Sequence, residues 1–248
     1  MSKCQLIQGD CLEEMNKLID EKVKVDLILT DLPYGTTACK WDNVIPFEPM
    51  WECFNGLSKE RTPVVLFGSE PFSSYLRLSN IKNYKYDWKW NKKKASSPLI
   101  AKIQPLRIME DIIVFYKKSK QYYPIMRKGK PRVDKKSLKP NGEAYGGKII
   151  ERGYNNPNGL YYPVNLLSIS NANQNNKLHP TQKPVSLLEY LIRTYTNEND
   201  LVLDCCMGSG STGVACLQTN RNFIGIELDE NYYNIAKKRC SEYQSKLW

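Results

Sequence analysis

The sequence predicts an α/β protein with a doubly wound, mostly parallel sheet, and three features support this prediction. Continuous apolar runs of strand length occur at residues 24–30, 62–69 and 201–204, as expected for parallel strands covered on both faces. Segments with helical periodicity alternate with these runs. The chain has 248 residues, which is enough for one such domain with a substantial core.

The individual elements follow from the same patterns. Strands are expected at residues 4–10, 24–30, 62–69, 86–92, 107–117, 201–204 and 223–228. Helices are expected at residues 11–19, 47–57, 211–219 and 230–247, and after Pro184, a residue suited to a first helical turn. Asp229 is the expected N-cap of the last helix.

The region from 118 to 178 has a different composition, rich in Lys, Asn, Gly, Pro and Tyr. A structureless loop of this length is uncommon in a compact domain, so an inserted subdomain is the favoured interpretation. A disordered basic linker is the alternative, although the many tyrosines argue against it. The expected organisation is therefore residues 1–117, a basic insertion at 118–178, and residues 179–248.

Composition excludes several classes of protein. No run of about 18 apolar residues is present, which argues against a membrane span, and the first residues lack a secretory signal. A cytoplasmic protein with reduced thiols is expected. The eight cysteines form no C-x-x-C pair and there is one histidine, His179, so no metal site is expected. The net charge of +10 favours a polyanionic partner.

A glycine loop, "DCCMGSGSTG" at 204–213, lies between an expected strand and an expected helix. Gly208 and Gly210 allow a backbone to approach a ligand closely, and Glu227 ends the next strand, where an acid can bind ribose hydroxyls. The loop lacks the G-x-G-x-x-G spacing of a dinucleotide site and has no P-loop lysine. Asp204 would repel a pyrophosphate and attract a cation, so the sulfonium cofactor S-adenosylmethionine fits better. A tight structural turn is the alternative.

Three motifs together resemble the beta class of amino-methylating DNA methyltransferases. They are "DLPY" at 31–34, which looks like that family's D-P-P-Y motif, "HPTQKP" at 179–184, and the glycine loop, in that order. The resemblance covers residues 4–117 and 178–240. It implies a circularly permuted, Rossmann-like seven-stranded sheet, with a target-recognition region inserted between the two halves, and it suggests a homodimer.

The resemblance also implies how the "DLPY" segment works. An exocyclic amine is a poor nucleophile, and a pocket helps by accepting hydrogen bonds from its N–H groups. Asp31 would accept one, the backbone carbonyl of Leu32, held by Pro33, would accept another, and Tyr34 would stack on a base that has left the duplex. Leu32 replaces a usual proline, but its role belongs to the main chain.

Other residues are assigned by the same resemblance. Expected cofactor contacts come from the strand ends, the glycine loop and the "HPTQKP" box: Asp10, Thr181, Lys183, Asp204, Cys205, Gly208, Ser209, Gly210 and Glu227. Several have structural alternatives. Asp10 can cap a helix, and Thr181 and Lys183, proposed near the methionine carboxylate, can form a helix-entry turn. Phe67 can line the pocket or belong to the core, and Cys205 can be packing.

Double-stranded DNA is the expected partner. Between Lys117 and Arg152 there are twelve basic and three acidic residues, an excess of nine positive charges. Expected phosphate contacts are Lys92, Lys93, Lys94, Arg127, Lys128, Lys130 and Arg132. A solvated surface is the alternative for the three consecutive lysines.

The expected activity is methyl transfer from S-adenosylmethionine to the N6 amine of adenine in DNA. Cytosine-N4 methylation is the close alternative, because the chemistry of the amine is the same. A non-catalytic DNA-binding protein that retained the fold is the alternative from another class, but it would not need an intact catalytic motif and glycine loop. The resemblance favours adenine, because the cytosine enzymes of that family often have serine at the position of Asp31.

Overall fold

The structure is a computed structural model, and it describes residues 3–36, 42–96, 101–118, 122–140, 142, 146–153, 155–171 and 182–245. The chain divides into two compact units. One comprises residues 1–123 and 165–248, and the other comprises residues 124–164. Each is described by itself.

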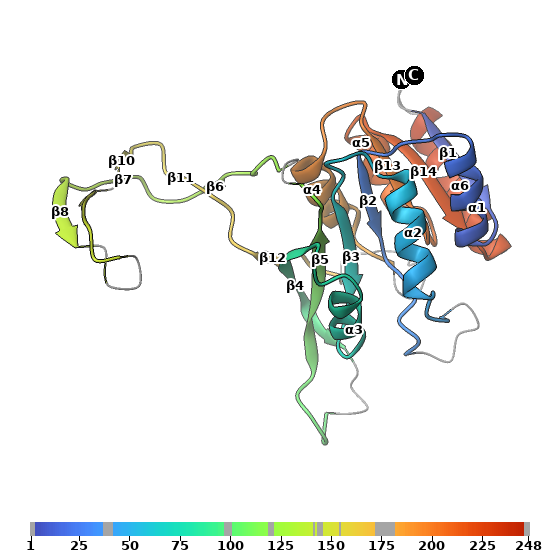
Figure 1. The fold of residues 1–248 in the computed structure, drawn as a ribbon, viewed down its shortest axis with the longest axis horizontal. Helices are drawn as coiled ribbons and strands as arrows, with labels where there is room; N and C mark the ends of the chain where they lie inside the picture. Colours follow the sequence, from blue (N-terminus) through green and yellow to red (C-terminus); the bar gives the residue numbers. More distant parts are fainter. Residues whose placement is uncertain are drawn as a thin grey trace. The chain divides into compact units, whose positions relative to one another are not determined.

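The larger unit contains an eight-stranded sheet in the order β1-β14-β13-β2-β3-β5-β4-β12 (Figure 1). Its strands are β1 (Cys4–Gln8), β2 (Leu27–Thr30), β3 (Val64–Gly68), β4 (Tyr84–Ser96), β5 (Arg107–Phe115), β12 (Leu166–Ser168), β13 (Leu201–Asp204) and β14 (Asn222–Glu227). Only β5 among them is antiparallel to its neighbours. The doubly wound, mostly parallel sheet is thus confirmed. The seven expected strands are present, and the short β12 adds an eighth.

Helices cover the sheet in two groups. Helices α1 (Cys11–Asp20), α2 (Phe47–Leu57) and α3 (Phe72–Ser79) contribute to one apolar core, and α4 (Val185–Tyr195), α5 (Ser211–Gln218) and α6 (Glu230–Ser245) contribute to the other. The central strand β2 serves both cores, because alternate side chains of a strand point to opposite faces. Ile28 belongs to the first core, and Leu27 and Leu29 belong to the second. This double coverage explains the continuous apolar runs.

The described residues of the smaller unit form three short antiparallel strand pairs. Strand β6 (Arg127–Lys128) pairs with β11 (Leu160–Tyr161), β7 (Arg132–Val133) with β10 (Asn155–Asn156), and β8 (Ser137–Pro140) with β9 (Ile149–Arg152). The chain therefore runs out through β6, β7 and β8 and returns through β9, β10 and β11.

None of the helices in the described ranges has both the length and the apolar character needed to cross a membrane.

Candidate active site

The candidate site lies at the carboxyl edge of the parallel strands. Strands β2 and β13 are neighbours, but β2 continues through α2 to β3 on one side and β13 continues through α5 to β14 on the other. Such a divergence is where open α/β sheets bind ligands. Four adjacent strands each end at or near an acid: Asp10 after β1, Glu227 on β14, Asp204 on β13 and Asp31 after β2.

Asp31 stands at the centre of a small cluster of polar side chains. The Tyr34 hydroxyl donates to its Oδ1 at 2.7 Å, and Lys183 Nζ donates to its Oδ2 at 2.5 Å. The ring of Tyr34 stacks on Phe72, with centroids 4.9 Å apart and planes inclined by 24°. Burial, together with the charge of Asp31, raises the pKa of Tyr34 well above its ordinary value, so the phenol remains a donor.

The loop that carries Asp31 and Tyr34 is held at several points. Leu32 is buried in the first core, so the residue that departs from the D-P-P-Y pattern anchors the loop by packing. Gly35 has φ +67°, and a Cβ there would meet Val44 at 2.8 Å. The Asp42 carboxylate accepts hydrogen bonds from the backbone N–H groups of Gly35 and Thr36, each at 2.9 Å. The sequence interpretation missed Asp42, which gives no local signal of this role.

A row of charged side chains, buried or partly buried, extends from Asp31 into the protein. Lys183 Nζ also lies 3.5 Å from Glu110 Oε2, and Lys92 Nζ donates to Glu110 Oε1 at 3.0 Å. The side chains of Lys92 and Lys183 are each only 9% exposed. Lys183 further lies over the ring of Phe67, 5.0 Å from its centroid. Phe67 is thus both a core residue and a wall beneath this cation.

The pKa shifts in this row follow from burial and from neighbouring charges. Burial raises the pKa of Asp31 above its ordinary value, although Lys183 opposes the shift. Burial alone would raise the pKa of Glu110, but Lys183 and Lys92 bring it below its ordinary value. Burial disfavours the charged form of Lys183, yet Asp31 and Glu110 raise its pKa. Lys183 is therefore a fixed cation between two acids.

Asp204 is buried beneath the glycine loop. Its Oδ2 accepts from the Thr212 hydroxyl at 2.6 Å and its Oδ1 accepts from the Cys206 backbone N–H at 3.1 Å. Burial raises the pKa of Asp204 to about 6 despite these bonds. The carboxyl group thus ties the end of β13 to the first turn of α5.

The glycine loop itself adopts left-handed backbone at two positions, Gly208 with φ +51° and Gly210 with φ +76°. Glu227 closes the loop from the neighbouring strand, because its Oε2 accepts from the Gly208 N–H at 2.8 Å and its Oε1 accepts from the Asp229 N–H at 2.9 Å. The Ser209 hydroxyl donates to Gln182 Oε1 at 3.3 Å. This contact brings the described end of the "HPTQKP" box next to the loop.

The polar groups at this edge of the sheet suit S-adenosylmethionine. Asp10, Asp204 and Glu227 supply carboxylates at three adjacent strand ends, and the described loop residues from Asp204 to Gly210 include no cation that would bind a phosphate. A carboxylate oxygen has two lone pairs, so Glu227 keeps acceptor capacity beyond its two backbone bonds. Acidic acceptors match a cofactor that carries a sulfonium, an amine and ribose hydroxyls.

The remaining predicted cofactor residues have mixed placements. Asp10 caps α1, accepting from the Leu12 and Glu13 N–H groups at 2.9 and 3.2 Å. Cys205 is buried, with its Sγ 3.6 Å from Thr30 Oγ1, which accords with a packing role. Thr181 and His179 lie outside the described residues. Arg239, which the sequence interpretation missed, donates to the Ser209 backbone carbonyl at 2.5 Å.

The expected DNA contacts separate into two groups. Lys92 does not fit the expectation, because it lies on β4, is buried and pairs with Glu110 rather than facing outward. Lys93 and Lys94, next to it on the same strand, are exposed. The four expected contacts that lie in the smaller unit are all exposed: Arg127, Lys128, Lys130 and Arg132. Arg132 forms an ion pair of 2.6 Å with Asp134.

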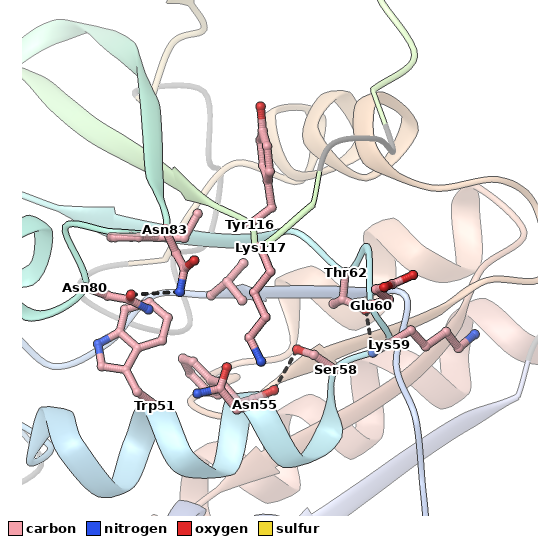
Figure 2. A pocket seen from close by; sticks show the side chains of 13 residues that line it. Trp51, Asn55, Ser58, Lys59, Glu60, Thr62, Asn80, Asn83, Tyr116 and Lys117 are labelled. Atoms are coloured by element: carbon pink, nitrogen blue, oxygen red, sulfur yellow. Dashed lines mark hydrogen bonds between the residues drawn. The ribbon is translucent and has the colours of Figure 1, made fainter.

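A separate shallow hollow lies at the opposite edge of the sheet, by the first residue of β3, Val64, and the last residue of β5, Phe115 (Figure 2). Trp51, Asn55 and Lys117 also line it. None of the predicted site residues lines it. It is distinct from the edge that carries Asp31.

Comparison with known proteins gives consistent relationships. The family described as DNA methylase, of N6 and N4 type, matches residues 25–238. The chain is 29% identical over 251 residues to "DNA adenine methyltransferase YhdJ" of Escherichia coli (strain K12), covering 94% of this chain and 81% of that protein. The solved M1.HpyAVI–SAM complex has a TM-score of 0.63 and 28% identity, covering 95% of this chain and 98% of that one. The PvuII DNA methyltransferase (cytosine-N4-specific) shares the fold, with a TM-score of 0.66 and 19% identity, covering 99% and 91%.

Proposed function

This chain belongs to the DNA methylase family, whose members methylate an exocyclic amine of adenine or cytosine, and we propose that its target is the N6 amine of adenine. Its cofactor is S-adenosylmethionine, which supplies a methyl group activated by the positive sulfur. Double-stranded DNA is the proposed substrate. A homodimer remains a prediction of the resemblance, to be measured by sedimentation.

The chemistry requires an aligned amine, and the residues after β2 supply the alignment. The lone pair of an aromatic amine is delocalised into the ring, and hydrogen bonds accepted from its N–H groups favour the more nucleophilic geometry. We assign one acceptor to the Asp31 carboxylate and the other to the Leu32 carbonyl. The ring of Phe72 stacks on the ring of Tyr34 and would hold Tyr34 in an orientation suited to stacking on an extruded base.

One observation supports this assignment above the others: Asp31 is a partly exposed carboxylate, 21% accessible, held by a buried cation and an aromatic hydroxyl at the edge shared with the glycine loop. An anionic acceptor suits an exocyclic amine, and adenine is favoured because the cytosine enzymes of the resembled family often have serine where this chain has Asp31. The name of the similar Escherichia coli protein, an adenine methyltransferase, favours the same base.

The test is transfer of labelled methyl from S-adenosylmethionine to unmethylated DNA, followed by mass spectrometry of the nucleosides. We expect N6-methyladenine. N4-methylcytosine as the product would overturn the adenine assignment while leaving the amino-methyltransferase in place.

The Asp31→Ala variant tests the role of the acid. We expect it to abolish transfer and to leave cofactor affinity, measured by calorimetry, within a few-fold of the parent protein. A large loss of cofactor affinity would mean that Asp31 belongs to the cofactor site instead.

A further inference from the structure

Four charged side chains from four separate segments form a continuous row that ends at Asp31. Lys92 of β4 contacts Glu110 of β5 at 3.0 Å, Glu110 lies 3.5 Å from Lys183, and Lys183 contacts Asp31 at 2.5 Å. The charges alternate in sign and sum to zero. Exposure is 9%, 16%, 9% and 21% along the row, so the accessible end is Asp31.

We propose that Lys183 and Glu110 are positioning residues for methyl transfer: Lys183 keeps Asp31 ionised and oriented as an acceptor, and Glu110 holds Lys183 in place. The proposal rests on the proposed function of Asp31. The sequence predicted that Lys183 lies near the methionine carboxylate of the cofactor. The proposal instead assigns it to Asp31, the acid that accepts a hydrogen bond from the amine.

The energetics of the row favour a functional role over a stabilising one. Taking ions out of water costs several kcal/mol each, and apolar replacements of buried ion pairs are often neutral or stabilising. Lys183 lies against the aromatic rings of Phe67 and Tyr34, 5.0 and 6.0 Å from their centroids, where an apolar side chain would pack. A lysine at this position does what such a side chain could not: it places a fixed positive charge beside Asp31.

The charge matters because only the ionised carboxylate offers both oxygens as acceptors. Among the described residues, four groups act on Asp31: Lys183 before α4, Glu110 from β5, Tyr34 from its own loop and Asp204 from β13. Lys183 and Tyr34 favour the ionised form of Asp31, by charge and by hydrogen bonds, whereas the negative charge of Glu110 disfavours it. Glu110 therefore fixes the cation but also opposes the ionisation that the cation supports.

This opposition gives the proposal a distinctive test with two matched substitutions. Lys183→Gln removes the cation, so the acidic limb of the pH profile of kcat/KM should move to higher pH, on the order of 1 to 3 units. Glu110→Gln removes a negative neighbour, so the same limb should move to lower pH. Both variants should lose turnover at the plateau, about 10- to 100-fold, because the acceptor is less well aligned.

Two further variants complete the design. Lys183→Arg keeps the cation and should return the limb toward that of the parent protein. Lys85→Gln, a lysine exposed on the same strand as Lys92, should leave the profile unchanged. A row that only supports the fold would lower activity in both amide variants without moving the limb in opposite directions, and that result would overturn the proposal.

A direct measurement separates this proposal from the proposed function. The Asp31 carboxyl carbon is titrated by NMR in protein labelled with ¹³C-aspartate, with the signal assigned by Asp31→Asn. We expect its titration to move up in Lys183→Gln and down in Glu110→Gln, whatever base the enzyme methylates. No transfer to DNA would refute the function, and an unmoved carboxyl titration would refute the role of Lys183 and Glu110.

Discussion

Asp204 should make the cofactor-free protein lose stability as the pH rises from about 4 to 7. The group is 3% exposed, and its pKa is raised from 3.8 to about 6 by burial. A raised pKa means that the folded state binds the proton more tightly than the unfolded state, so protonation stabilises the fold. That contribution is fully present below about pH 4 and is lost as the pH passes through 6. A shift of this size corresponds to about 3 kcal/mol.

The measurement is urea unfolding of the parent protein and of Asp204→Asn at several pH values, without cofactor. Because asparagine does not titrate, the free energy of unfolding of the parent should fall relative to the variant by about 2 to 3 kcal/mol between pH 4 and 7. Glu52→Gln, an exposed acid on α2, controls for a surface acid-to-amide change. A difference that stays constant within about 0.5 kcal/mol, or that changes with the opposite sign, would refute the reasoning.

Three other predictions address the loop and the DNA contacts. Glu227→Ala should weaken cofactor binding by about 1 to 3 kcal/mol in calorimetry, because buried hydrogen bonds are lost, and unchanged affinity would remove this residue from the cofactor site. Gly210→Ala should lower the free energy of unfolding by at least about 1 to 2 kcal/mol, because the backbone is left-handed and a new Cβ would lie 2.8 Å from that of Ala236; an unchanged unfolding midpoint would contradict this. Lys128→Gln and Lys130→Gln should each reduce the slope of log affinity for DNA against log salt by about 1, and an unaltered slope would mean that these residues do not contact phosphates.

The parts of the fold that could be predicted are those governed by burial. Strands such as β2 are covered on both faces, and this leaves a continuous apolar run in the sequence. Helix α3 was not expected, because its eight residues, "FSSYLRLS", are too few to show a clear period. Strand β12 was also missed, since three residues carry no pattern of their own.

The sequence predicted the acids of the candidate site at the strand ends, but it could not predict which distant charged residues pair with one another. Consecutive acids on β5 illustrate the difference. Asp111 pairs with Arg77 and Lys89, whereas Glu110, on the opposite face, pairs with Lys92 and Lys183. Alternation along the strand separates the two acids, but nothing local names their partners.

The three consecutive lysines after Asn91 show the same limit. A run of like charges suggests a solvated surface, and Lys93 and Lys94 fit that description. Lys92 points inward because its acidic partner lies on the neighbouring strand β5, and a sequence pattern cannot reveal which of three identical side chains has a buried counter-ion.

The pairing of Asp31 with Lys183 has a consequence for how the protein is made. These residues are 152 positions apart. A second contact, from the Leu201 backbone N–H at the start of β13 to Asp26 just before β2, joins residues 175 positions apart. Contacts of such long range slow folding, because a large loop must close before they form. During synthesis the acid therefore leaves the ribosome long before its counter-ion does. The ion pair can form only after the chain beyond residue 182 has emerged, so the growing chain carries Asp31 without the cation that pairs with it.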